Sequence, residues 1–163
     1  MTEAEIIDVI VMNKFKPRTW AVCPNVTQVL PWEADLLAVS ASGKIHEVEV
    51  KVTASDLKRD RLKKKWMTKP PGELPGPDKG FYHVENNVHF FWYAVPEELK
   101  AVVVEVAGAV GAGVIICAGK DIIEITRGRG FRGPEKVENI EIRLHRLAGL
   151  RYWCKRLGTV MAP

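Results

Sequence analysis

Alternation of charged and apolar residues is clearest in the segment Ile45–Val52. Glu47, Glu49 and Lys51 recur at every second position, and a valine follows each of them. This period of two predicts a strand with one charged face in water and one apolar face against the core. The segment Glu33–Val39 runs into a turn sequence at Ser42-Gly43, so it is expected to pair with Ile45–Val52 as a hairpin.

The remaining periodicity predicts alternating helices and strands within a single domain, 1–163. The first helix begins with a Thr2-x-x-Glu5 capping box and carries apolar residues at helical spacing. The proline- and glycine-rich residues 69–80 predict a flexible loop. Helices are expected over Thr2–Phe15, Ala54–Met67, Glu97–Ala107 and 134–158, and strands over Trp20–Leu30, Glu33–Val39, Lys44–Val52, Val88–Val95, Gly113–Ala118 and Asp121–Thr126.

The expected hairpin brings Asp35 near Glu49 and Lys51. Carboxylate and carbonyl oxygens are the ligands that Mg²⁺ prefers, and a nearby lysine can orient a water or offset negative charge on a phosphate. This trio suits metal-assisted phosphodiester hydrolysis. An exposed strand with mixed charges, in which Glu49 pairs with Lys51, is the structural alternative.

Asp35 followed by Glu49-Val50-Lys51 resembles the signature of the PD-(D/E)XK nuclease superfamily, although Ala34 stands where that family often has proline. The wider segment from Glu33 to Asp60 is similar to small MmcB-like DNA-repair or phage-type members. The resemblance implies an α/β fold of restriction-endonuclease type. That fold has an αβββαβ core, a mixed central sheet flanked by helices, and here a C-terminal β-hairpin and helix.

The resemblance also implies roles for individual residues. Asp35, Glu49 and the Val50 carbonyl would ligate Mg²⁺, for which Mn²⁺ can substitute, and Lys51 would position the attacking water. The superfamily often places an acidic residue on its first helix near the metal. Glu3 is the favoured residue for that role, because Glu5 is accounted for by the helix cap.

Basic residues gather after the candidate site. The net charge is +4 and the sequence pI is near 9.0, which favours polyanionic partners. The residues expected to contact a duplex or branched DNA are Lys58, Arg59, Lys63, Lys64 and Lys65 of the second helix, and Arg127 and Arg129 of a glycine-rich loop. The alternative is a solvated helix face on which Asp56 and Asp60 pair with neighbouring lysines.

Cys23, Cys117 and Cys154 are widely spaced, so neither a zinc site nor a disulfide framework is expected, and buried thiols in a cytoplasmic protein fit best. The four histidines have no ligand-like spacing. The longest apolar run is too interrupted to span a membrane, so no membrane partner is expected.

The sequence therefore predicts a Mg²⁺-dependent DNA endonuclease that acts in DNA repair, recombination or phage DNA processing. One alternative is a catalytically inactive nucleic-acid-binding module on the same fold. Another is an assembly protein that oligomerises through the C-terminal helix. A nuclease of this size needs a homodimer to cut both strands, so a second copy of the chain is a candidate partner.

Overall fold

The computed structural model describes residues 1–27, 30, 33–60, 88–128, 130 and 139–157. Within them, helices and strands follow one another in an order close to the predicted one. The helices are α1 (Glu3–Asn13), α2 (Ala54–Asp60), α4 (Lys100–Val110) and α5 (Ile140–Leu157), with a 3-10 turn η1 (Glu97–Leu99) before α4. The strands are β1 (Trp20–Val26), β2 (Ala34–Ser40), β3 (Ile45–Val50), β4 (Phe90–Pro96), β5 (Gly113–Ala118) and β6 (Asp121–Thr126).

The six strands form one mixed sheet in the order β1-β2-β3-β4-β5-β6. Strands β1, β2 and β3 form an antiparallel meander, and β5 and β6 form an antiparallel hairpin. The two central pairings, β3 with β4 and β4 with β5, are parallel. Parallel neighbours need crossover connections, and α4 supplies the one between β4 and β5.

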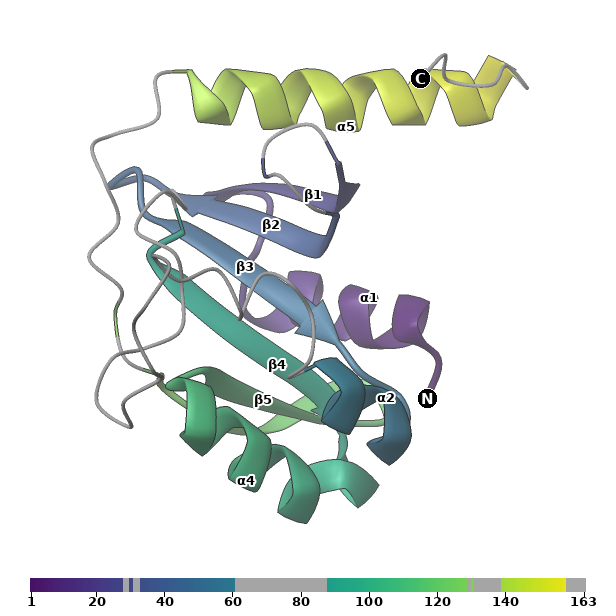
Figure 1. Cartoon of the computed structure of the whole chain (residues 1–163). Coiled ribbons are helices and arrows are strands. Elements are labelled where there is room, and N and C mark those ends of the chain that lie inside the picture. The colour runs from purple at the N-terminus through teal and green to yellow at the C-terminus, as the bar shows by residue number, and fades with distance from the viewer. Residues whose placement is uncertain (28–29, 31–32, 61–87, 129, 131–138, 158–163) are drawn as a thin grey trace.

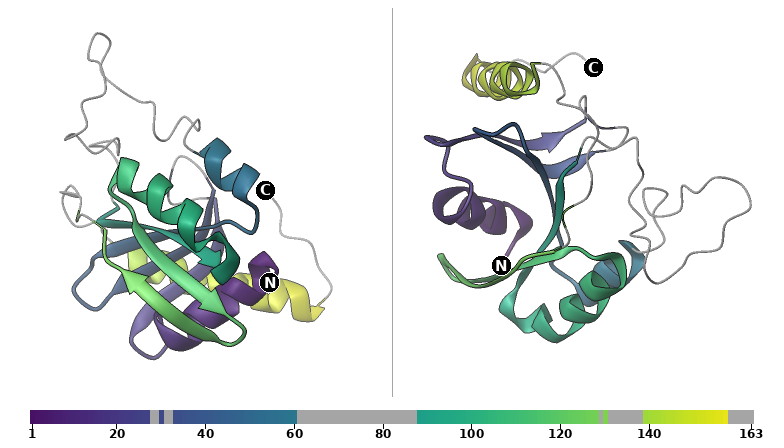
Figure 2. Two further views of the ribbon diagram at one scale, coloured as in Figure 1. Left: turned by 90° about the horizontal axis from the view of Figure 1, so that it is seen from below. Right: turned by 90° about the vertical axis from the view of Figure 1, so that its left-hand side faces the viewer.

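Helices cover both faces of the sheet, which curves around α1 (Figures 1 and 2). Ile6 and Ile10 of α1 are fully buried against one face, in a cluster that includes Leu36, Val48 and Trp92. The other face packs against α2, α4 and α5 in a second cluster, in which Leu57 and Leu144 are fully buried. This packing makes β3 and β4 central strands that are covered on both faces.

Local sequence signals account for the ends of two helices. The Thr2 hydroxyl accepts a hydrogen bond from the Glu5 backbone, and the Glu5 carboxylate accepts one from the Thr2 backbone, so the capping box is confirmed. Helix α4 ends at Gly111, which adopts a left-handed conformation with φ of 73°. Glycine reaches this conformation without the steric cost that a Cβ would bring.

The structure corrects the predicted exposure of β3. All six of its residues are buried, so the face carrying Glu47 and Glu49 is not in water. The reason is that α2 and its neighbours cover the side of the strand that the alternation assigned to solvent. Lys51 is likewise buried, whereas Val52, which was assigned to the core, is 40% exposed.

Other boundaries differ by a few residues. The first strand ends at Val26 rather than Leu30, and the helix after β4 begins with the 3-10 turn and runs on to Val110. The loop 69–80, the last part of the predicted second helix and the start of the C-terminal helix lie outside the described residues. Helix α5 packs on the sheet beside β1, and Cys23 and Cys117 are buried free thiols. No helix among the described residues is long and apolar enough to cross a membrane.

Candidate functional site

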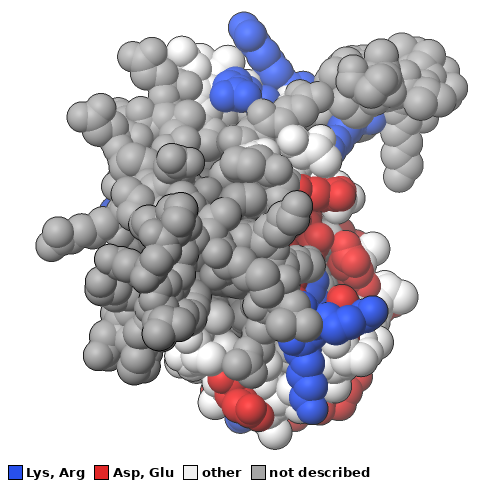
Figure 3. All heavy atoms as spheres, viewed as in Figure 1, with Lys and Arg blue, Asp and Glu red and all other residues white. Residues whose placement is uncertain are grey.

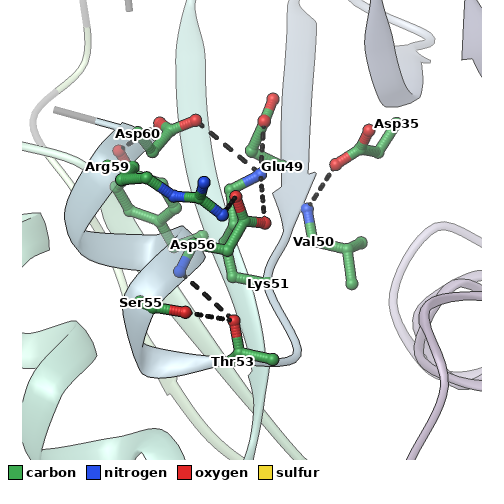
Figure 4. A network of polar contacts seen from close by, with 10 residues as sticks. Asp35, Glu49, Val50, Lys51, Thr53, Ser55, Asp56, Arg59 and Asp60 are labelled. Carbon is green, nitrogen blue, oxygen red and sulfur yellow. Dashed lines mark hydrogen bonds and ion pairs between the residues drawn. The ribbon is translucent and has the colours of Figure 1, made fainter. Parts of the chain in front are cut away.

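The candidate site lies where β2 and β3 separate. Their ladder stops at the pair Leu36–Val48, and extending its register places Asp35 opposite Glu49. Beyond that pair, a side chain rather than the backbone of β2 bonds to β3. Asp35 Oδ2 accepts a hydrogen bond of 2.7 Å from the backbone N–H of Val50 (Figure 4). The hairpin therefore brings Asp35 and Glu49 together, as the sequence predicted.

Lys51 follows β3 and turns its ammonium group into a cluster of carboxylates (Figure 4). Its Nζ lies 2.6 Å from Glu49 Oε1, 3.7 Å from Asp56 Oδ2 and 3.7 Å from Asp60 Oδ1. The Lys51 side chain is only 5% exposed. A buried ammonium group is costly unless anions and hydrogen bonds compensate it, and three carboxylates within 4 Å supply that compensation.

Asp60 and Tyr93 extend the cluster beneath Lys51. Asp60 is fully buried, and its Oδ2 accepts a hydrogen bond of 2.7 Å from the Tyr93 hydroxyl. Tyr93 reaches this position because it pairs with Glu49 in the parallel register of β3 and β4. Burial, and then the charge and hydrogen bond of Asp60, raise the pKa of the Tyr93 hydroxyl, so Tyr93 serves as a neutral donor.

Helix α2 supplies Asp56 and Asp60 from one face, because residues four apart are neighbours on a helix. The Thr53 hydroxyl accepts a hydrogen bond of 3.2 Å from the Asp56 backbone at the start of this helix. Asp56 is partly exposed and lies 3.8 Å from the guanidinium group of Arg59. The helix therefore begins directly over the end of β3 and turns its acidic face toward Lys51.

The buried carboxylate of Glu49 and the partly buried carboxylate of Asp35 lie close enough to repel each other. Burial, and next the charge of Glu49, raise the pKa of Asp35 to about 7, although the hydrogen bond from Val50 and the charge of Lys51 act in the opposite direction. The charge of Glu3 also contributes to this increase. Such a site gains stability from a bound cation, because a cation removes the repulsion between the two carboxylates.

Glu3 itself is exposed on the first turn of α1. The buried residues of that helix, Ile6, Val9 and Ile10, begin one turn after Glu3. Its electrostatic effect on Asp35 still places it in the surroundings of the site. Glu5 is fully engaged in the helix cap, as expected.

The predicted nucleic-acid contacts divide into two regions. Lys58 and Arg59 are exposed on α2 beside the site, and the described surface around α2 carries acidic and basic side chains next to each other (Figure 3). Arg127 instead stacks over Phe90, the first residue of β4, which lies on the other face of the sheet from Tyr93, the partner of Glu49. Lys63, Lys64, Lys65 and Arg129 lie outside the described residues.

The carboxylate oxygens of Asp35 and Glu49 suit Mg²⁺, which needs few protein ligands, better than they suit a metal ion that needs three or more protein ligands. Among the described residues, no group of three or more His, Cys, Asp or Glu side chains is arranged to hold a metal ion. Mg²⁺ is usually bound through one or two carboxylates, with waters and substrate phosphates completing its shell. Asp35 and Glu49 supply two carboxylates whose charges repel each other, which is the number of protein carboxylates that such a site uses.

The sequence interpretation missed the contribution of Asp56, Asp60 and Tyr93. A signal for the two aspartates was present, since their spacing puts them on one face of the helix that follows the Glu49-x-Lys51 strand. No comparable signal singled out Tyr93. It lies in the almost continuous apolar run of β4, where periodicity does not tell one buried face from the other.

Comparison with known proteins gives a fold but no family. No model of a known protein family matches the chain, and no curated protein is significantly similar to it. Among solved structures, the chain is similar to a protein of unknown function from Silicibacter pomeroyi, with a TM-score of 0.57 and 14% sequence identity. The match covers 96% of this chain and 89% of that protein. At this identity the similarity shows a shared fold alone.

Proposed function

We propose that the protein is a Mg²⁺-dependent nuclease of the PD-(D/E)XK superfamily that hydrolyses phosphodiester bonds in DNA. The observation that carries the proposal is the juxtaposition of Asp35, Glu49 and Lys51 at the end of β3, with repulsion between the buried Glu49 and the partly buried Asp35. The order of elements from α1 to β4 is helix, three strands, helix, strand. That order supports an αβββαβ core of restriction-endonuclease type.

In this function, oxygens of Asp35, Glu49 and the Val50 carbonyl would hold Mg²⁺, and Mn²⁺ can take its place. The bound ion supplies Lewis acidity toward a phosphoryl oxygen. Lys51 donates from its ammonium group and thereby orients the attacking water or stabilises charge on the phosphate. Lys58 and Arg59, exposed on α2 beside the cluster, would contact the DNA backbone.

One observation favours a second candidate, an inactive nucleic-acid-binding module on the same fold. The Lys51 ammonium group is held by three carboxylates and its side chain is 5% exposed. This arrangement can serve as a structural ion cluster that locks α2 onto β3. A nuclease needs the ammonium group to exchange part of this cluster for water or phosphate when DNA binds.

The test is cleavage of supercoiled, linear and branched DNA with Mg²⁺ or Mn²⁺. Asp35→Asn, Glu49→Gln and Lys51→Met should each retain DNA binding and lose at least about 100-fold in cleavage rate, the size of effect seen when one charge-stabilising group is removed. Glu105→Gln changes an exposed carboxylate on α4 and should cleave like the wild type.

Each variant should first be shown to be folded by circular dichroism. Salt-dependent DNA binding without cleavage by the wild type, with either metal, would favour the inactive module. Cleavage by Asp35→Asn and Glu49→Gln at the wild-type rate would place the catalytic centre elsewhere.

A further inference from the structure

Three cations converge on the rings of Phe90 and Trp92, which lie on the opposite face of the sheet from Tyr93 and the acidic cluster. Lys14 lies at the end of α1, Lys44 just before β3 and Arg127 just after β6. Lys14 Nζ is 4.3 Å from the ring centre of Trp92, whereas Lys44 Nζ and Arg127 Cζ are 5.9 Å and 4.9 Å from that of Phe90. Residues far apart in the sequence thus place three positive charges over two adjacent rings.

The three cations lie over a packed cluster of rings formed by His46, Phe90 and Trp92. The His46 ring is stacked on Trp92 at 6.0 Å and lies 4.6 Å from the Phe90 ring centre. Trp92 Nε1 donates a hydrogen bond of 3.1 Å to His46 Nδ1, which fixes the orientation of both rings. All three side chains are at least nine-tenths buried, so they present a fixed surface to the cations above them.

The charge of this group has no counterpart among the described residues. None of the three cations forms an ion pair with any carboxylate of the described part of the chain. Burial, and next the charge of Arg127, lower the pKa of Lys14, and burial, with the charges of all three cations among the further causes, lowers the pKa of His46. Attraction to an aromatic ring is worth about 0.5–1 kcal/mol at an exposed site and does not by itself explain why two cations share Phe90.

The position of Arg127 is built into the fold rather than left to a free side chain. Gly128, the next residue, packs so closely on the backbone of Gly111, Ala112 and Gly113 that a Cβ would collide with all three residues. A Cβ at Gly130 would lie 3.4 Å from the nearest atom of the Phe90 ring, an ordinary van der Waals distance. The close packing of Gly128 therefore holds the chain after β6 against the start of β5.

We propose that Lys14, Lys44 and Arg127 form a binding site for a phosphate group. A phosphate offers three acceptor oxygens and up to two negative charges, and it would neutralise a cluster that is otherwise held together against like-charge repulsion. The phosphate can belong to a nucleic-acid strand or to a small phosphorylated compound. The inference is independent of the proposed cleavage, since it uses none of the residues of the acidic cluster.

The first test is thermal unfolding of the full chain in potassium phosphate and in potassium chloride at equal ionic strength and pH. The wild-type Tm should rise with phosphate concentration and, above the Kd, continue to rise with its logarithm, because a ligand at free concentration L that binds only the folded state stabilises it by RT ln(1 + L/Kd). Lys44→Gln and Arg127→Gln should lose this increase. Lys120→Gln is the matched control, because Lys120 is exposed at the opposite end of the same β5–β6 hairpin.

Equal wild-type Tm values in the two salts would overturn the proposal, as would an increase that Lys44→Gln and Arg127→Gln retain in full. If Lys44→Gln and Arg127→Gln have a lower Tm than the wild type in both salts but keep the full increase of Tm with phosphate, the cations serve only to stabilise the aromatic rings, and the proposal is wrong. Gly128→Ala gives an independent check, since it displaces Arg127 without removing its charge and should also reduce the phosphate increase.

A second measurement identifies the source of the phosphate. Binding of a fluorescein-labelled single-stranded oligonucleotide is followed by anisotropy at several salt concentrations. If the phosphate belongs to a nucleic-acid strand, Lys44→Gln and Arg127→Gln should each reduce the slope of log K against log salt by about 1. If it belongs to a small compound, inorganic phosphate should still stabilise the wild type while the two variants bind the oligonucleotide like the wild type.

Discussion

The carboxylate of Asp35 binds the backbone N–H of Val50, 2.7 Å away, at the point where the β2–β3 ladder has ended. The same carboxylate lies near Glu49, and burial with this charge raises its pKa to about 7. Asp35 therefore accepts a hydrogen bond from a backbone N–H, while burial and the charge of Glu49 destabilise its charged form. Asparagine at this position separates the two effects, because its amide oxygen can accept the hydrogen bond without a charge.

We expect Asp35→Asn to become more stable than the wild type as the pH rises, in metal-free buffer. A carboxyl group whose pKa is about 7 when folded and near 3.8 when unfolded binds more protons in the folded state across that window. The contribution of Asp35 to the stability of the wild type is therefore lost between pH 4 and pH 7, and the variant has no such contribution to lose. At about 1.4 kcal/mol per pKa unit, the difference between 3.8 and about 7 corresponds to a gain of the variant of the order of 4 kcal/mol by pH 8.

Urea unfolding with EDTA at pH 4, 6 and 8 measures this difference in the free energy of unfolding. The relevant quantity is its change with pH, because the substitution also alters packing at every pH. Parallel curves for the two proteins would mean that Asp35 ionises normally in the folded protein.

Mg²⁺ should offset the destabilisation that the charged form of Asp35 causes at high pH. At pH 8 the ion stabilises the charged forms of Asp35 and Glu49, so the wild-type Tm should increase with Mg²⁺ concentration. Asp35→Asn should show a much smaller increase, and Glu105→Gln should respond like the wild type. Thermal unfolding with MgCl₂, against NaCl at equal ionic strength, checks this. An equal increase in the wild type and Asp35→Asn would place the ion elsewhere.

Lys51→Met should destabilise the fold by about 3 kcal/mol or more, because it leaves Glu49 and Asp60 buried without their shared ammonium group. Adding Asp60→Asn removes one of these charges and should recover part of the loss. A double-mutant cycle from urea unfolding at pH 7 measures the coupling, which we expect between about 0.5 and 3 kcal/mol. Strict additivity of the two substitutions would contradict the cluster described here.

The sequence predicted the elements better than it predicted burial. The period of two in Ile45–Val52 identified a strand and placed Asp35 beside Glu49, because side-chain direction and hairpin register are local properties. It could not show that Glu47 and Glu49 are buried, since their cover comes from helices elsewhere in the chain. Alternation normally indicates one solvated face, and here tertiary packing overrides that expectation.

Charge density was also a poor guide to location. Arg127 was grouped with the basic helix because both are cationic, yet it stacks on Phe90, on the other face of the sheet from Tyr93, which pairs with Glu49. Only the antiparallel return of β6 along β5 fixes where Arg127 lies. The cluster it forms with Lys14 and Lys44 depends on that topology, so no local sequence pattern indicates it.

Tyr93→Phe should lower the free energy of unfolding by about 1–3 kcal/mol, because it removes the hydroxyl that donates to the buried Asp60 carboxylate. The ring and its packing remain, so the loss reports on the hydrogen bond. Urea unfolding at pH 7 measures it, with Glu105→Gln as a surface control expected within about 0.5 kcal/mol of the wild type. A loss no larger than that of the control would show that Asp60 does not depend on this donor.

His46 should make the protein sensitive to acid. Its Nδ1 accepts a hydrogen bond from Trp92 Nε1, and burial, with the neighbouring charges of Lys14 and then His89, lowers its pKa to about 3. Below pH 6.5 the unfolded chain takes up a proton that the folded chain does not, so stability falls as the pH decreases toward 3. From pH 6.5 to 5 the expected loss is about 2 kcal/mol.

His46→Gln should flatten this part of the pH profile, because the amide can still accept from Trp92 but does not titrate. His145→Gln, at an exposed position of α5, should keep the wild-type profile. Carboxylates change the stability of all three proteins alike, so the difference between profiles isolates the imidazole. Urea unfolding at pH 5, 6 and 7 measures it, and a His46→Gln curve parallel to the wild type would contradict a neutral, buried His46.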